Sequence, residues 1–393
     1  MRVLFAPNYF YLNFPIFESV ARNLRAHESQ TIFVRTRGHS PTEADAEYSD
    51  EYLTSRGIDL DTVFDCHPSR KGGRVAQLLS IGSEFQQVER SLARIRPDVV
   101  VVGSDLGNLR IRLLLTASEL AGIPVTILYT CDVPAQLNTS VDRVRRRLFA
   151  RARMRWSRLC RACVFIGATP GEFATRAHIG VLSAAIRTTL VERGLSEARI
   201  TVTGLPGRRS DEHGGGVKSG TKVVLTISPI AHESDGALEP QAVWAAVREL
   251  SARQRDVSFV VKLHPRETPS TVNAAAEFFS GTHVRVVKDG TAEDWLPCAS
   301  LVLAPTSRAV YTALAAGVPV LVLGRDTQRL PVPGPPTHED LASLPGCVAD
   351  LLNDEREMTR LASTCASAAA VLKSADAVDA MVRVVLAAGS QHQ

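Results

Sequence analysis

Short runs of branched apolar residues alternate with longer amphipathic stretches along nearly the whole chain, and this alternation limits the fold more than any other feature. It is typical of βα units around a parallel sheet that helices cover on both faces. The stretches 15–25 and 75–95 have helical periodicity, and the second stops before Pro97, because proline ends a helix. We predict buried strands at residues 2–6, 31–35, 98–102, 125–129, 162–166, 200–203, 222–227, 257–263, 284–287, 301–304 and 318–323.

The alternation is interrupted once, at Gly207–Thr221, a polar stretch with five glycines. Such composition is typical of a linker. The chain has 393 residues, which is enough for two domains that each bury a core. The sequence therefore predicts an N-terminal domain at 1–206, a linker at 207–221 and a C-terminal domain at 222–393. We expect two doubly wound, Rossmann-like α/β domains that face each other across a cleft.

Charge and cysteine content narrow the location and the partners. Seven dispersed cysteines, an N-terminus that enters a strand at once and the lack of an 18-residue apolar run predict a reduced, cytoplasmic protein. The net charge of +4 comes from Arg143–Arg161, where nine arginines occur without an acidic residue. This helical pattern fits either an ordinary surface helix or peripheral contact with an anionic inner membrane face. Nucleic acid is disfavoured, because aromatic residues are not interleaved with the arginines.

A histidine stands at the end of one predicted strand, in Lys262-Leu263-His264-Pro265-Arg266. The proline prevents the strand from continuing, so His264 is presented at the carboxyl edge of the sheet. A histidine there can bind a phosphate and stabilise charge that develops on it, and the flanking Lys262 and Arg266 are further candidates for binding the donor's phosphate. The alternative is a histidine that only caps the strand through backbone contacts.

Hydroxyl groups follow the strand at 301–304, at Thr306 and Ser307, where a helix is predicted to start and to run to Gly317. Free amides at a helix start, together with hydroxyls, can bind phosphate. Plain helix capping is the alternative. Ser228, which follows the strand at 222–227, is a further phosphate candidate, or else a turn residue before proline.

Three groups in the first half follow predicted strands and could act as a general base: Asp105, which we favour, His39 and Asp132. Each is also a common turn or cap residue. Asp59-Leu60-Asp61 matches the DxD pattern of metal-dependent glycosyltransferases, but we assign it to a polar loop of the first domain. We therefore expect neither a metal nor a cofactor.

Two motifs together give a family resemblance. VVKLHPRE at 260–267, followed by LVLAPTSRAVYTALAAGVPVLVLG at 301–324, resembles the C-terminal domain of bacterial GT-B fold transferases. The capsule-polysaccharide glycosyltransferases, the bacterial sialyltransferases and the CDP-glycerol glycerophosphotransferases are the most similar groups. The likeness covers about residues 222–324. It implies that His264 and Ser307, assisted by Thr306, hold the phosphate of a nucleotide-sugar donor. Thr312 occupies a position where these families often have an acidic residue for a ribose hydroxyl.

The resemblance implies a metal-independent glycosyltransferase that acts on a surface polysaccharide, a glycolipid or a related glycoconjugate, with the nucleotide-sugar as co-substrate. A glycan or a lipid-linked acceptor is then the second partner. Three alternatives remain open at this point. They are a non-hydrolysing UDP-sugar 2-epimerase, a CDP-glycerol glycerophosphotransferase and an inactive GT-B subunit that scaffolds a partner.

Overall fold

The computed structural model describes residues 1–7, 10–36, 59–64, 74–103, 109–129, 177–192, 195–205, 222–229, 238–264, 267–290, 292–305, 307–324, 334–372 and 376–390. These residues form two compact units, each built on a parallel sheet. The first unit comprises Met1–Thr203 and Asp376–Gln393, and the second comprises Gly204–Ala375.

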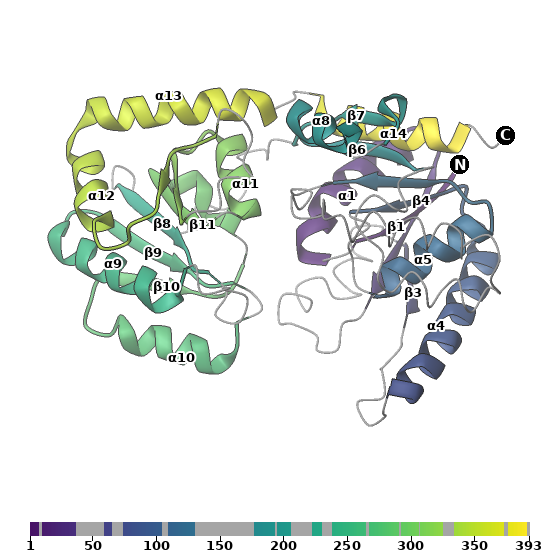
Figure 1. The fold of residues 1–393 in the computed structure, drawn as a ribbon, viewed down its shortest axis with the longest axis horizontal. Coiled ribbons are helices and arrows are strands. Elements are labelled where there is room, and N and C mark those ends of the chain that lie inside the picture. Colours follow the sequence, from purple (N-terminus) through teal and green to yellow (C-terminus); the bar gives the residue numbers. More distant parts are fainter. Residues whose placement is uncertain are drawn as a thin grey trace. The chain divides into compact units, whose positions relative to one another are not determined.

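The first unit has a seven-stranded sheet in the order β3-β2-β1-β4-β5-β6-β7 (Figure 1). All its strand pairs are parallel. Its elements are β1 (Arg2–Ala6), α1 (Phe10–Ala26), β2 (Gln30–Thr36), β3 (Asp59–Phe64), α4 (Arg74–Ile95), β4 (Val99–Val102), α5 (Leu109–Leu120), β5 (Val125–Leu128), β6 (His178–Val181), α8 (Ala184–Glu192), η3 (Glu197–Arg199), β7 (Ile200–Val202) and α14 (Ala377–Ser390).

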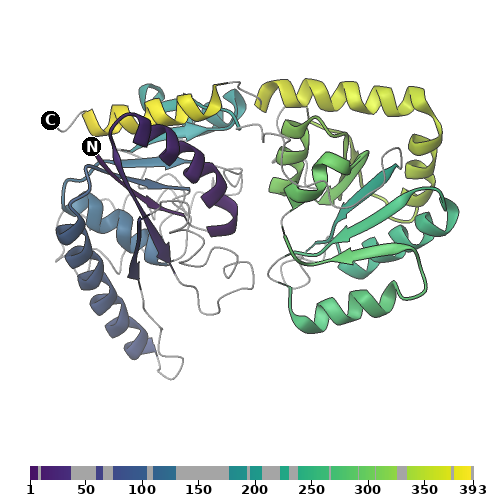
Figure 2. The same ribbon diagram turned by 180° about the vertical axis from the view of Figure 1, so that it is seen from behind.

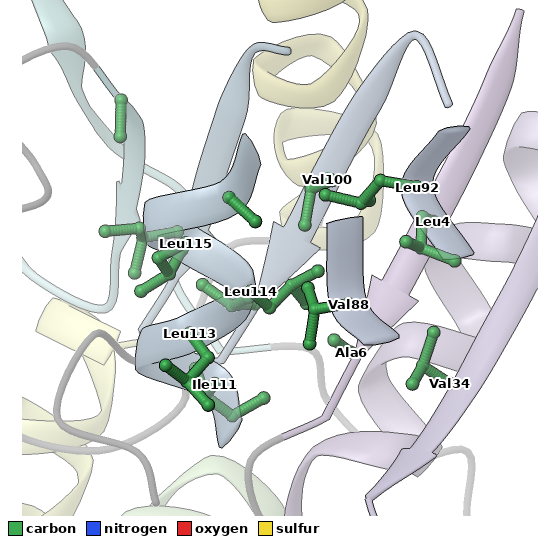
Figure 3. Close-up of a cluster of buried hydrophobic side chains, with 14 of the residues drawn as sticks. Leu4, Ala6, Val34, Val88, Leu92, Val100, Ile111, Leu113, Leu114 and Leu115 are labelled. Atoms are coloured by element: carbon green, nitrogen blue, oxygen red, sulfur yellow. The ribbon is translucent and has the colours of Figure 1, made fainter. Parts of the chain in front are cut away.

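Strand β1 shows why its residues form a central strand. Leu4 and Ala6 belong to a buried cluster with side chains of α4 and α5 (Figure 3). Phe5 points to the other face, where its ring contacts Phe17 of α1 at 5.4 Å between centroids. Both faces are thus covered by helices, and the strand requires apolar residues at its four buried positions, 3–6.

The last helix of the chain returns to the first unit. Helix α14 packs against α1 and the strands β4 to β7, and Figure 2 shows α1 and α14 side by side. Met381, Val385 and Ala388 are buried in this contact, and Asn23 donates a hydrogen bond to Asp379 at 3.5 Å. The second unit therefore ends at Ala375, whereas the sequence predicted a second domain that runs to Gln393.

The second unit has a six-stranded parallel sheet in the order β10-β9-β8-β11-β12-β13. Helix α9 packs against β9 and α12, and α11 packs against β11, β12 and α13. The elements are β8 (Val223–Ile227), α9 (Pro240–Arg253), β9 (Ser258–Lys262), α10 (Pro269–Phe278), β10 (Val284–Val287), η4 (Ala292–Cys298), β11 (Leu301–Pro305), α11 (Arg308–Ala316), β12 (Val320–Leu323), β13 (Thr337–His338), α12 (Leu344–Asn353) and α13 (Glu355–Leu372).

The predicted α/β class with two doubly wound parallel sheets is confirmed. Helix α4 ends at Ile95, directly before Arg96-Pro97, and α11 ends at Ala316, directly before Gly317, whose φ of 78° is left-handed. Residues Asp59–Phe64 form the edge strand β3, so assigning Asp59-Leu60-Asp61 to a loop was wrong. The strand predicted at 162–166 and the linker at 207–221 lie outside the described residues.

Candidate functional site

The strand order of the second sheet reverses direction between β8 and β11. In doubly wound sheets, ligands bind beyond the carboxyl ends of the strands at such a point. Ile227 at the end of β8 is paired with Lys262 at the end of β9, and Thr226 is paired with Leu303 of β11. The residues that follow these three strands therefore share one edge of the sheet.

His264 lies two residues beyond the end of β9 and is half-buried. Its carbonyl accepts a hydrogen bond from the amide of Glu267 at 3.0 Å, which closes a tight turn directly after the strand. His264 therefore lies at the carboxyl edge of the sheet, as the sequence predicted. Its binding of phosphate stays a prediction. Arg266 lies outside the described residues.

Ser307 is the residue that precedes the first turn of α11. Its backbone is extended, with φ −155° and ψ 171°, but its side chain makes no capping hydrogen bond. The Oγ atom is buried and has no hydrogen-bond partner within the described part of the chain. A buried hydroxyl without a partner costs about 1–3 kcal/mol, so a ligand that bonds to it gains by satisfying it. The start of α11 also favours an anion through its backbone dipoles.

Ser228 follows β8 and is only 3% exposed. Its Oγ accepts a hydrogen bond from Nε1 of Trp244 at 3.1 Å, and Trp244 is itself buried in α9. This bond ties the end of β8 to the helix that packs beside it. Ser228 thus has a structural partner, whereas Ser307 on the neighbouring strand end has none among the residues that the structure describes.

Lys262 is 3% exposed, which is unusual for a lysine. Its Nζ donates to the carbonyl oxygens of Leu263 at 2.9 Å and of Lys288 at 2.6 Å. Thr312 is half-buried in α11, and its Oγ1 donates to the carbonyl of Ala309 at 3.1 Å, one turn back. These bonds connect both side chains to the protein backbone, and their roles toward a donor stay predictions.

A polar cluster follows β13, the last strand of the second sheet. The Oγ atom of Ser343 lies 3.2 Å from Nε2 of His338. The pKa of the Asp340 carboxyl is below its usual range, because the Ser343 hydroxyl and the Ala342 amide donate to it and the positive form of His338 attracts it. Asp340 and Ser343 are exposed and lie in the turn that leads into α12, so this cluster supports that turn.

Several predicted site residues lie outside the described residues. They are the base candidates His39, Asp105 and Asp132, the phosphate candidate Thr306 and the arginine-rich segment Arg143–Arg161. Among the residues that the structure does describe, no group of three His, Cys, Asp or Glu side chains is arranged to hold a metal ion. In the same part of the chain, no helix is long and apolar enough to cross a membrane.

Two residues near this edge, Trp244 and Glu267, were not predicted from the sequence. Trp244 reads as one more apolar position of an amphipathic helix, and only the fold brings its indole N–H to Ser228. Glu267, just beyond the histidine turn, is 3% exposed, although glutamate is rarely buried. Neither position follows a strand directly, so the rule of inspecting strand ends does not find it.

No protein-family model matches the chain, and comparison with curated proteins finds no match in sequence. Solved structures match it over nearly the whole length. UDP-GlcNAc 2-epimerase from Neisseria meningitidis, bound to UDP-GlcNAc, has a TM-score of 0.66 at 15% identity and covers 98% of this chain and 100% of its own. MurG from Acinetobacter baumannii has a TM-score of 0.58 at 14% identity, with 98% and 99% covered. The glycotransferase of kitacinnamycin has a TM-score of 0.61 at 16% identity, with 98% and 99% covered.

These neighbours are GT-B fold enzymes, and the sheet orders of both units agree with that architecture. The chain therefore has the GT-B fold, as the sequence predicted. Identities this low show the fold alone.

Proposed function

We propose that the protein binds a nucleotide-activated sugar at the carboxyl edge of its second sheet. The observation that carries this proposal is the buried Oγ of Ser307, which has no partner among the described residues and stands at the start of α11. A phosphate oxygen there accepts from the hydroxyl and is stabilised by the helix dipole. His264 on the same edge supplies a second hydrogen-bond donor to a phosphate.

We further propose that the enzyme transfers the sugar to an acceptor hydroxyl of a surface polysaccharide, a glycolipid or a related glycoconjugate. The leaving nucleotide gains negative charge as its bond to the anomeric carbon breaks, and His264 stabilises that charge, while Ser307 holds the phosphate in the ground and transition states alike. The attacking hydroxyl must lose a proton, which we assign to a base of the first unit. Asp105, which follows β4, is our first choice, before His39 and Asp132.

Titration calorimetry with CMP, CDP and UDP tests the binding step. At least one nucleotide should bind to the native protein, and Ser307→Ala should weaken that binding. Ser228→Ala is the matched control, since it removes a hydroxyl from the adjacent strand end that already has a partner. If none of the three nucleotides binds, the proposed donor site is wrong.

A non-hydrolysing UDP-sugar 2-epimerase is the second candidate, and one observation favours it. Several of the similar structures are UDP-GlcNAc 2-epimerases, including those with a TM-score of 0.66. An epimerase needs no acceptor. Incubation with UDP-GlcNAc alone, followed by proton NMR of the sugar, separates the candidates: inversion at the sugar's C2 shows an epimerase, and an unchanged donor supports the transferase.

A further inference from the structure

The buried ammonium group of Lys262 joins two loops at the carboxyl edge of the second sheet. Its hydrogen bonds go to the carbonyl of Leu263, directly before His264, and to the carbonyl of Lys288, directly after β10. β9 and β10 are neighbours, and Val287 is paired with Lys262. The side chain therefore links the two main chains at the point where each of them leaves the sheet.

Placing a lysine here has a cost that apolar residues avoid. Burial takes the ammonium out of water, and this is tolerated only when its donors are well paired. The other four residues of β9, Ser258 to Val261, have no charge, and three of them are buried. The two carbonyls that accept from the ammonium offset part of the cost of burying a charge at this position.

We propose that Lys262 is a positioning residue for His264. It fixes the carbonyl of Leu263 and thereby the direction of the main chain into the histidine turn. The amide of Leu263 is held as well, because it donates to the carbonyl of Val287 at 2.8 Å. Both polar groups of the Leu263 backbone are thus bonded directly before His264, the amide to the main chain of β10 and the carbonyl to the ammonium that also binds Lys288.

This role differs from the direct phosphate contact that the sequence suggested for Lys262. Testing this inference by nucleotide binding rests on the proposed function, in which His264 binds the donor's phosphate. A direct phosphate contact by Lys262 and a positioning role predict different nucleotide affinities for the variant that lacks both the Lys262 and the His264 side chain. Lys262 acts through His264 in the second case, so its removal has little further effect once His264 is gone.

The test is a double-mutant cycle on nucleotide binding, with Lys262→Met, His264→Ala and the double variant. We expect Lys262→Met to weaken binding about tenfold, since it leaves two carbonyls without their donor. The double variant should bind no more weakly than His264→Ala. Lys262→Arg, which keeps the charge and the donors, should restore part of the loss. Additive losses, or a Lys262→Met variant that binds like the native protein, would overturn the proposal.

Lys222 provides a matched control. It stands directly before β8, at the opposite edge of the same sheet, and its Nζ donates to the carbonyl of Leu352 at 2.5 Å. Lys222→Met also removes a bond between a lysine and a carbonyl, but it should leave nucleotide binding within about twofold of the native value, because ΔΔG contributions of distant sites are independent. If Lys222→Met weakens binding as much as Lys262→Met does, a general loss of stability is the cause and the proposal fails.

Amide hydrogen exchange separates this inference from the proposed function. Lys262→Met should accelerate exchange at the amides of Leu263 and Glu267, whereas Lys222→Met should not. If the native protein binds none of CMP, CDP and UDP, the proposed function fails, and the exchange rates still decide whether Lys262 orders the turn. If Lys262→Met does not fold, Lys262→Gln, whose amide can still donate to one carbonyl, replaces it in both experiments. Unchanged exchange at Leu263 and Glu267 in a folded variant contradicts the inference.

Discussion

The sheets of the two units share one strand order around their central strands, yet these strands end in different side chains. In the first unit β1 is followed by Pro7 and β4 by Gly103, and both residues are buried. In the second unit the equivalent strands β8 and β11 lead to Ser228 and Ser307, and β9 leads to His264. The common topology determines where a ligand can bind, and the side chains at the strand ends determine what is bound.

The two serines of the second unit extend this comparison to a single sheet edge. Both follow central strands and both hydroxyls are buried. The Ser228 hydroxyl accepts a bond from Trp244, while the Ser307 hydroxyl has no partner among the described residues. A hydroxyl that is already bonded stabilises the fold, and one that is not can bind a ligand. Burial and sequence position alone do not distinguish them.

The first prediction asks whether the first unit supplies the base. Asp105→Asn should keep nucleotide binding but lower the transfer rate by about 10²–10⁴-fold, since an amide cannot accept the acceptor's proton. Rates of transfer and calorimetric binding are measured on the same preparation. His39→Gln and Asp132→Asn are the parallel variants, and near-native rates in all three would remove the base from these positions.

The second prediction concerns His264. His264→Ala should lower turnover by about 10²–10³-fold, the range for losing one preorganised donor to developing charge. The melting temperature should change little, because the half-buried residue lies beyond the strand and outside the core. A variant that melts much earlier but keeps native specific activity would give His264 a structural role only.

The third prediction concerns Ser307, whose hydroxyl has no partner in the described part of the chain. Ser307→Ala should raise the donor KM about tenfold with kcat nearly unchanged, since one hydrogen bond to phosphate is lost equally from the ground and transition states. Stability should stay level or rise, because the variant no longer buries an unsatisfied hydroxyl. Initial rates over a range of donor concentrations measure this, and an unchanged KM would argue against the contact.

The fourth prediction concerns Ser228, the serine whose hydroxyl is already bonded to Trp244. Ser228→Ala leaves the buried indole N–H of Trp244 without its acceptor, so the free energy of unfolding should fall by about 1–3 kcal/mol. Nucleotide affinity should stay within about twofold of the native value, since no phosphate contact is lost. Urea denaturation and calorimetry together test this. Intact stability with a large loss of affinity would reverse the roles of the two serines.

Much of the fold could be predicted because buried parallel strands are nearly continuous in branched apolar residues, as in Val99–Val102 and Val223–Ile227. β6 (His178–Val181) escaped detection because it contains a glycine. A Cβ on Gly180 would lie 2.8 Å from Leu128 Cδ2, so close packing against β5 requires glycine there. β3 begins with Asp59-Leu60-Asp61, and its polar residues resemble a loop. β13 has only two residues, too few for a pattern.

The site was predictable to a smaller extent. The strand-end rule finds His264, Ser228 and Ser307, because it needs only the sequence and the direction of the strands. The rule does not predict that Trp244 bonds to Ser228 or that the ammonium of Lys262 binds the carbonyl of Lys288, since these partners are distant in sequence. The second domain was predicted to run to Gln393, whereas α14 belongs to the first unit, because the sequence does not show which surface a helix near the end of the chain covers.

Calorimetric titration of the native protein and of Ser307→Ala with CMP, CDP and UDP is the most direct test of the central claim. The account predicts that one nucleotide binds to the native chain and that the variant binds it about tenfold more weakly, as the loss of one hydrogen bond to phosphate implies. It also predicts that Ser228→Ala binds like the native protein. Equal affinity of the native protein and Ser307→Ala, or no binding of any of the three nucleotides, would contradict the assignment of the donor site to the second sheet.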